Sequence, residues 1–170
     1  MVKTLDLGGL SIREILSLAI NPPEPKAVEN GIQLLTDLGA LKPVAGGATE
    51  ELTPLGDRLA QIPVHPAIGK CLLMGSLFSA YGDGSCGLRP LIAACATLSY
   101  KSPFVLPFGK EKEADRARKR YGHGLLSDHR LFAKVSRDYG RWRNSSRGEF
   151  ARWADDNFLS PKTLKMTEQM

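Results

Sequence analysis

Near the start of the chain, apolar residues recur every three or four positions, which is the spacing of one face of an α-helix. They are Ile12, Ile15, Leu16 and Ala19. Ser11 precedes this stripe and Glu14 follows it by three residues, a capping box that satisfies two free amides at a helix start. Asn21 and the two prolines behind it predict the helix end, because proline lacks an amide hydrogen and disfavours helical geometry in the residue before it.

A second helix is predicted to begin at Pro25, since proline suits the first helical turn. Gly39 follows the last apolar position and suits the left-handed conformation that often closes a helix. The apolar stripe between them consists of Val28, Ile32, Leu35 and Leu38. The first 40 residues therefore predict two amphipathic helices.

Two short apolar pieces, 41–44 and 51–52, flank the sequence AGGAT and predict a β-hairpin with a flexible tip. Thr53 then caps a third helix, which has Pro54 at its first position and ends before Pro63. Two helices, a hairpin and a short helix are the content of a small winged-helix unit, although their order differs from the commonest version.

From Pro66 onward the pattern is helical only. Ser127 is a candidate cap for one of these helices, with Asp128 placed favourably near its positive end. Helices are predicted at 66–80, 88–98, 111–121, 127–143 and 148–158, and the sequence SPKTLKMTEQM begins another. We therefore expect a mainly α fold, with a winged-helix domain at 1–65 and a helical bundle at 66–170.

Charge is distributed unevenly along the chain. Residues 1–100 contain 7 Lys/Arg and 9 Asp/Glu, a net charge of −2, whereas residues 101–170 contain 16 and 9, a net charge of +7. The second part is the candidate for binding a polyanion, because clustered basic residues neutralise phosphates and release counterions. The run KEKEADRARKRY taken alone is also explained as a solvated helix face with paired charges at helical spacing.

Several classes of protein do not fit the sequence. Its apolar stretches are too short to span a membrane, and its amino end lacks the apolar core of a secretory signal. The three cysteines, Cys71, Cys86 and Cys95, contain no CxxC pair and are interpreted as reduced, buried thiols of an intracellular protein. The three histidines match no metal-ligand spacing, so each is expected to be a cap or a packing residue.

The chain also lacks the motifs of independent enzymes. It has no phosphate-binding loop, no GxSxG and no HExxH. Asp128 and His129 could be taken for an acid/base pair, but adjacent residues on a helix point to different faces. We therefore expect no catalysis and no cofactor in this chain.

Four motifs remain distinctive, three of them punctuated by proline, and they occur in this order: LTPLGDRLAQIPVHPAIGKCLLMGSLF, LSYKSPFVLP, SDH and NFLSPKTLKM. Together they resemble the helicase-associated region of DEAH-box and related RNA helicases, in which a winged helix precedes a ratchet-like helical bundle. The resemblance covers nearly the whole chain. It implies a C-terminal fragment of such a helicase, and we expect the chain to end inside its last helix.

The resemblance implies partners as well as a fold. ATP and Mg²⁺ would be bound by motor domains outside this chain, which would move along single-stranded RNA. The region would pack on those motor domains, adjoin an oligonucleotide-binding-like domain and form one wall of the RNA channel. In some family members the winged helix docks glycine-patch activator proteins. The compartment would be the nucleus or the cytoplasm.

A sequence-tolerant RNA channel needs polar groups, main-chain amides and surfaces for stacking. On that basis we predict that Lys101 and Ser102 contact phosphate or ribose, and that Pro103 or Phe104 supports a base or braces the turn. Ordinary core packing is an equal explanation for Phe104. We further predict that the start of the helix 127–143 contacts the RNA strand through Asp128, His129 and Arg130. Asp128 is also explained as a structural cap.

Two other functions are compatible with the sequence. A free-standing winged-helix nucleic-acid-binding module would need a basic recognition helix, but AVENGIQLLTDLGAL contains no Lys or Arg. A protein-interaction scaffold would use the acidic first 100 residues as its docking face.

Overall fold

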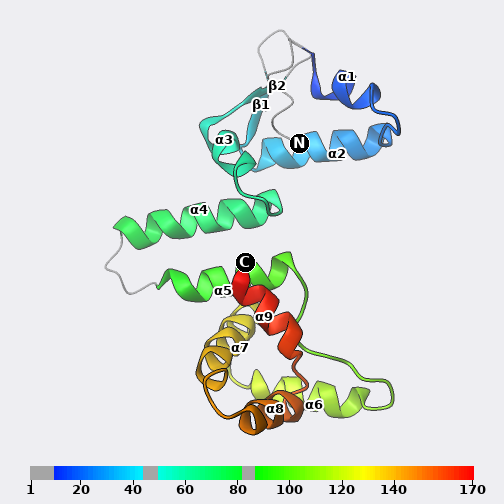
Figure 1. Ribbon diagram of the computed structural model, residues 1–170. Helices are drawn as coiled ribbons and strands as arrows, with labels where there is room; N and C mark the ends of the chain where they lie inside the picture. Colours follow the sequence, from blue (N-terminus) through cyan, green and yellow to red (C-terminus); the bar gives the residue numbers. More distant parts are fainter. Residues whose placement is uncertain (1–9, 44–49, 82–86) are drawn as a thin grey trace. The chain divides into compact units, whose positions relative to one another are not determined.

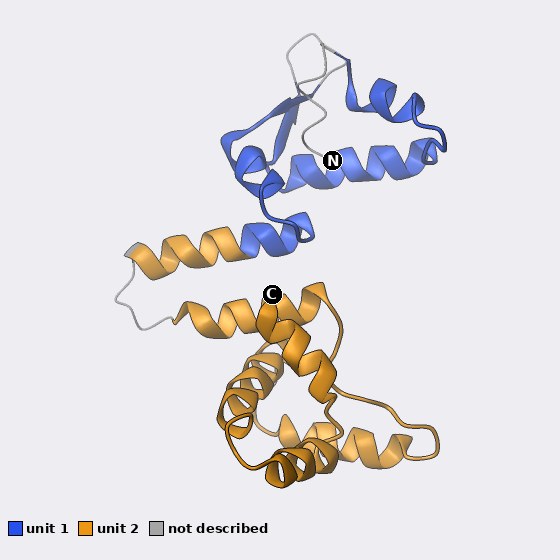
Figure 2. Ribbon diagram, viewed as in Figure 1, with its two compact units in different colours: residues 1–71 blue, residues 72–170 orange. Residues whose placement is uncertain are grey.

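The computed structural model describes residues 10–43, 50–81 and 87–170 (Figure 1). Within them lie nine α-helices and one two-stranded sheet. The chain divides into two compact units, Met1–Cys71 and Leu72–Met170, and the division falls inside helix α4 (Pro66–Tyr81) (Figure 2). The domain boundary after residue 65 stays a prediction.

Unit 1 opens with α1 (Ile12–Ser17), whose capping box forms as predicted. The amide of Ser11 donates to Glu14 Oε2 at 2.7 Å, and the amide of Glu14 donates to Ser11 Oγ at 3.2 Å. The bond from the Ser11 amide, and then the bond that the Ser11 hydroxyl donates to the same carboxylate at 2.8 Å, hold the pKa of Glu14 below its usual value. The predicted extension to Asn21 is wrong, because Leu18 and Ala19 donate to carbonyls only three residues back and tighten the last turn.

Helix α2 (Pro25–Asp37) begins at the predicted proline and buries Ile32 and Leu35. Gly39 has φ +75°, and its amide donates to Thr36 while the amide of Ala40 donates to Leu35. This pair of bonds is a Schellman motif, which satisfies the last helical carbonyls and needs a residue without a Cβ at Gly39. The predicted C-cap is therefore confirmed.

The hairpin consists of β1 (Leu41–Pro43) and β2 (Glu50–Leu52), antiparallel with Leu41 opposite Leu52. Its predicted tip, AGGAT, lies outside the described residues. Helix α3 (Pro54–Ala60) follows, and Thr53 Oγ1 accepts from the amide of Gly56 as expected of a cap. The same hydroxyl donates to the carbonyl of Gly39 at 2.7 Å, so it also ties α3 to the end of α2.

Arg13 connects three elements of unit 1. Its guanidinium bonds the carboxylate of Glu29 on α2 and, at 2.6 Å, Glu50 on β2. The hydrogen bonds that Arg13 donates to Glu29 and then to Glu50 raise the pKa of Arg13. The side chain of Glu50 is only 9% exposed, so the guanidinium of Arg13 offsets part of the cost of burying this carboxylate.

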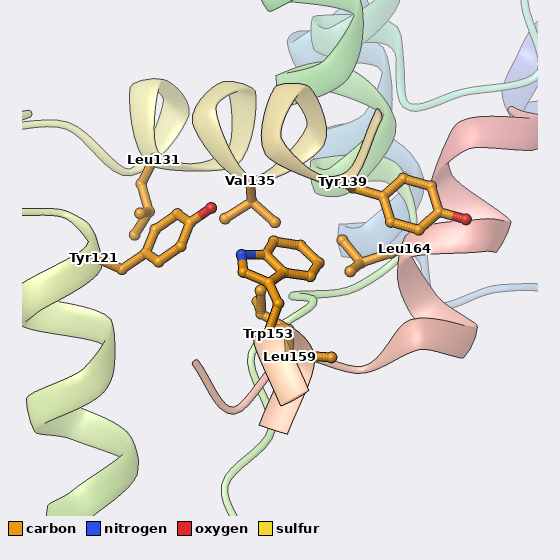
Figure 3. Packing of buried hydrophobic residues seen from close by; sticks show 8 residues of the cluster. Tyr121, Leu131, Val135, Tyr139, Trp153, Leu159 and Leu164 are labelled. Atoms are coloured by element: carbon orange, nitrogen blue, oxygen red, sulfur yellow. The ribbon is translucent and has the colours of Figure 1, made fainter. Parts of the chain in front are cut away.

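Unit 2 holds the rest of the helices: α5 (Leu88–Ser99), α6 (Glu111–Tyr121), α7 (Asp128–Trp142), α8 (Arg147–Asp156) and α9 (Pro161–Gln169). Helix α5 packs on α7 and α9, and α7 also contacts α8. The core gathers around Trp153, whose ring lies beside Val135 and between Tyr121 and Tyr139 (Figure 3). The remaining members of this core are Leu131, Ala154, Leu159 and Leu164.

Three local expectations need correction or restriction. Ser127 stands at the N-cap position of α7, but its side chain makes no capping hydrogen bond. Of the described cysteines, Cys95 is buried, but Cys71 on α4 is exposed and the prediction that it is buried is wrong. The sequence of α4 is apolar on all sides, so it does not mark which face is the inner one. Cys86 lies outside the described residues. None of the described helices is long and apolar enough to cross a membrane.

Candidate nucleic-acid interface

The segment 101–105 is held in place by the segment 158–160. The amide of Val105 donates to the carbonyl of Phe158, and the amide of Ser160 donates to the carbonyl of Pro103, both at 2.8 Å. Phe104 and Leu159 thus form an antiparallel bridge. Two of the sequence motifs, LSYKSPFVLP and NFLSPKTLKM, are therefore neighbours in the fold, and the segment is fixed at its backbone.

The four predicted residues of this segment differ in exposure. Lys101 and Ser102 are exposed, and the Lys101 ammonium lies 5.7 Å from the centroid of the Tyr100 ring. Phe104 is half-buried. Pro103 is less than 2% exposed, so its ring can brace the turn but offers no surface to a base. Lys101 and Ser102 are consequently the side chains of this segment best placed to meet a ligand.

Arg118 on α6 connects this segment to the start of α7. Its guanidinium lies 5.6 Å from the centroid of the Phe104 ring, within the range of a cation–π contact. Its Nη2 lies 3.0 Å from Asp128 Oδ1. The structure therefore brings Phe104 and Asp128, two predicted site residues, around one arginine that we did not predict.

A signal for Arg118 exists in the sequence, although it is weak. Ala114, Ala117 and Tyr121 form the buried face of α6, which places Arg118 at the border between that face and solvent. The ring of Tyr121 meets Phe104 edge to face at 6.3 Å. An arginine at such a border can reach both an aromatic ring and a carboxylate, but the run KEKEADRARKRY offers several arginines and does not say which one does.

The first turn of α7 presents the other predicted group. Asp128, His129 and Arg130 are all exposed there. Asp128 is engaged by Arg118, and Arg130 makes only a 3.5 Å contact to the carbonyl of Leu125. Since Ser127 does not cap the helix, no described side chain accepts from the first-turn amides of α7. Such amides and the helix dipole favour an approaching anion.

The charged helix α6 fits both interpretations of its sequence, a solvated face with paired charges and part of a basic region that could bind a polyanion. Lys119 and Asp115 form an exposed pair at 2.7 Å, as the solvated-face explanation requires. Exposed pairs of this kind contribute little to stability. The +7 net charge of residues 101–170 nevertheless leaves this region basic. Among the described residues, no group of three or more His, Cys, Asp or Glu is placed to hold a metal ion.

The described residues thus combine a unit that contains a small hairpin with a helical unit whose second half is basic. Residues 31–64 match the family described as "Helicase associated domain (HA2), winged-helix", and residues 65–160 match "Helicase associated domain (HA2), ratchet-like". The chain belongs to the helicase-associated (HA2) family of DExH-box RNA helicases. The predicted fold class, a winged helix followed by a ratchet-like bundle, is confirmed.

Curated relatives agree with this assignment. The chain is 41% identical over 170 residues to the DExH-box ATP-dependent RNA helicase DExH1 of Arabidopsis thaliana and 40% identical over 172 residues to the human ATP-dependent DNA/RNA helicase DHX36. Each match covers 99% of this chain and 15% of the relative. A third match, 38% identical over 113 residues, is the mouse ATP-dependent RNA helicase DHX29 and covers 66% of this chain. The chain thus spans about one seventh of the first two relatives.

Proposed function

We propose that this chain is an accessory, non-catalytic part of a DEAH-box or DExH-box ATP-dependent RNA helicase and forms one wall of its single-stranded RNA channel. ATP and Mg²⁺ would act in motor domains of the same protein, outside this chain. The observation that carries the proposal is that Arg118 contacts both Phe104, in the segment 101–105, and Asp128, in the first turn of α7. Lys101 and Ser102 in that segment are exposed, as are His129 and Arg130 in that turn.

The chemistry of this cluster suits a strand bound through its backbone. Lys101 and Arg130 supply exposed positive charges, and Ser102, His129 and the first-turn amides of α7 supply hydrogen-bond donors. Contacts to phosphate and ribose carry no sequence information, which is what a moving helicase requires. Arg118 neutralises Asp128, so the carboxylate does not repel a phosphate strongly.

Exposed apolar residues support packing on the motor domains. On α4 and α5 the exposed side chains include Leu77, Phe78 and Ile92, and Phe78 is 73% exposed. Because α4 is apolar on all sides, part of its apolar surface is exposed to solvent in the isolated chain, which is unfavourable. The motor domains and an oligonucleotide-binding-like domain are the partners that we propose to cover it.

Unit 1 has a separate hollow between α1 and α2, with a volume of about 550 Å³. It is lined by apolar and charged side chains that include Leu16, Pro22, Pro23, Val28 and Glu29. This hollow is compatible with a peptide partner, and a glycine-patch activator is part of our proposal for the whole helicase. We place that helicase inside the cell, in the nucleus or the cytoplasm.

The proposal is tested by binding of fluorescent single-stranded RNA to the 170-residue chain at several salt concentrations. Replacing Lys101 and Arg130 together by alanine should weaken binding and reduce the slope of log K against log salt by about 0.7 for each lost phosphate contact. Lys26→Ala is the matched control, because Lys26 is an exposed lysine of unit 1. It should leave both quantities unchanged.

A second arm measures function in a complete helicase. The chain replaces the matching segment of human DHX36, and RNA unwinding is measured with and without the Lys101→Ala/Arg130→Ala pair. The pair should reduce unwinding without abolishing ATP hydrolysis, since the motor domains keep their own site. Unchanged unwinding would contradict the channel-wall proposal, whereas loss of binding through Lys26 would favour the free-standing winged-helix alternative.

A further inference from the structure

A second aromatic and basic surface lies where α7 meets α8. Between residues 137 and 153 the chain has five arginines, no lysine and both of its tryptophans. Trp142, at the end of α7, is 38% exposed, and its ring stacks on the buried ring of Trp153 with centroids 6.2 Å apart and planes 16° from parallel. Trp153 belongs to the core of unit 2 and therefore holds the stacked ring of Trp142 in place.

The corner that carries Trp142 is well ordered by its own hydrogen bonds. The amide and the hydroxyl of Ser145 both donate to the carbonyl of Trp142, at 3.0 and 2.6 Å. Ser146 and Glu149 form a complete capping box at the start of α8. Phe150 packs against Trp153 with ring centroids 5.9 Å apart. An indole held in this way loses little conformational entropy when a flat ligand stacks on it.

Several arginines of this corner remain available to a ligand. The side chain of Arg141 is 73% exposed and contacts Asp138 only at 3.7 Å, while Tyr121 donates to the other carboxylate oxygen of Asp138. Arg147 is exposed and forms no ion pair within the described residues. Arginine presents a planar fork that suits phosphate and also stacks on bases, which lysine does not.

We propose that the α7–α8 corner, defined by Arg141, Trp142 and Arg147, is a second binding site for single-stranded nucleic acid. One unpaired base stacks on the outer face of Trp142, and the two arginines bind the adjoining phosphates. Stacking on an indole accepts any base and therefore fits a strand bound without sequence preference. The choice of RNA as the ligand depends on the proposed function; the site itself rests on the corner alone.

The corner is distinct from the proposed channel wall. Asp128 and Trp142 occupy opposite ends of α7, and a helix that rises 1.5 Å per residue places them about 20 Å apart. Trp142 is also the single large exposed hydrophobic residue between 137 and 153. A protein-docking surface needs a wider apolar centre, so the surrounding arginines favour a polyanion.

Intrinsic fluorescence tests the site directly, because Trp142 and Trp153 are the only tryptophans of the chain. Titration with an unlabelled single-stranded octanucleotide RNA should quench the emission, and a duplex of the same length should not, since its bases are already stacked. In Trp153→Phe, where Trp142 is the sole emitter, the quenching should be stronger. If that variant fails to fold, the wild-type titration provides the same readout.

Affinity measurements on matched variants complete the test. Trp142→Ala should weaken binding of the labelled octanucleotide by about tenfold, whereas Trp142→Phe, which keeps an aromatic face, should retain most of the affinity. Arg147→Ala should lower the salt slope by about 0.7. Lys26→Ala again serves as the control.

The outcomes separate this site from the channel wall. Unchanged emission at saturating RNA, together with unchanged affinity in Trp142→Ala, would overturn the corner site while leaving the effects of Lys101 and Arg130 to support the wall. No binding of the octanucleotide at about 50 mM salt, where phosphate contacts are strong, would also overturn it. In that case the wall is still judged by the unwinding assay of the chimaeric helicase.

Discussion

The buried hydroxyl of Tyr121 offers a test of how unit 2 is held together. Tyr121 donates to Asp138 Oδ2 at 2.6 Å, and its ring lies 4.4 Å from the Lys134 ammonium. Tyr121→Phe keeps the ring and removes the hydroxyl, and with it the bond to the Asp138 carboxylate, whose side chain is 16% exposed. A hydrogen bond to a charged group contributes about 1.5–3 kcal/mol, so the variant should lose about 2 kcal/mol of unfolding free energy at pH 8.

Tyr121 should also make the unfolding free energy depend on pH. Burial, and then the hydrogen bond to Asp138, raise the pKa of Tyr121 above the ordinary tyrosine value of about 10. A raised pKa means that the stabilisation is complete below pH 10 and is lost as the pH rises, because the unfolded chain ionises first. Between pH 9 and pH 11 the difference between wild type and Tyr121→Phe should therefore shrink by about 1.4 kcal/mol.

Urea unfolding followed by tryptophan fluorescence measures this difference, since both tryptophans lie in unit 2 and Trp153 belongs to the same core as Tyr121. Tyr139 also has a raised pKa, through burial and then the charge of Glu168, but it is common to both proteins and cancels in the comparison. If the difference in unfolding free energy between wild type and Tyr121→Phe stays constant from pH 9 to pH 11, ionisation of Tyr121 does not destabilise the fold at alkaline pH and the reasoning is refuted.

Three further substitutions test unit 1. Gly56→Ala would place a Cβ 2.2 Å from the carbonyl oxygen of Ala40, a backbone atom that cannot move aside alone, so it should cost about 2 kcal/mol or more of stability, measured by thermal unfolding; an unchanged melting temperature would contradict this packing. Gly39→Ala should cost about 1 kcal/mol because of its positive φ, and exchange of the amide hydrogens at the end of α2 should become faster. Arg13→Ala should cost about 1–3 kcal/mol by leaving the carboxylate of Glu50 buried without its cation, and Glu50→Gln in the same background should recover part of that loss, as measured in urea.

Local signals explain why most helices could be predicted from the sequence. The capping box at Ser11, the proline at Pro25 and the glycine at Gly39 each act within a few residues, so their effect does not depend on the rest of the fold. The early end of α1 escaped prediction, because Ile20 is apolar in sequence yet 99% exposed in the structure. Periodicity alone cannot tell a buried apolar residue from an exposed one.

The candidate site depends on long-range pairing, which the sequence does not reveal. The bridge between Phe104 and Leu159 joins residues that are far apart in the chain, and the contact of Arg118 with both Phe104 and Asp128 requires α6 and α7 to be placed already. The motifs predicted which segments matter. They could not predict that Pro103 is buried while Lys101 is exposed, because both residues belong to the same motif, LSYKSPFVLP.

The central claim is that the face formed by 101–104 and the start of α7 lies against single-stranded RNA in a helicase. The most direct measurement is photo-crosslinking in the chimaeric DHX36, with a photoreactive amino acid placed at position 101, 129 or, as a control, 26. All three positions are exposed in the chain. We predict RNA crosslinks from 101 and 129 and none from 26. Crosslinks from 26 with none from 101 or 129 would contradict the claim.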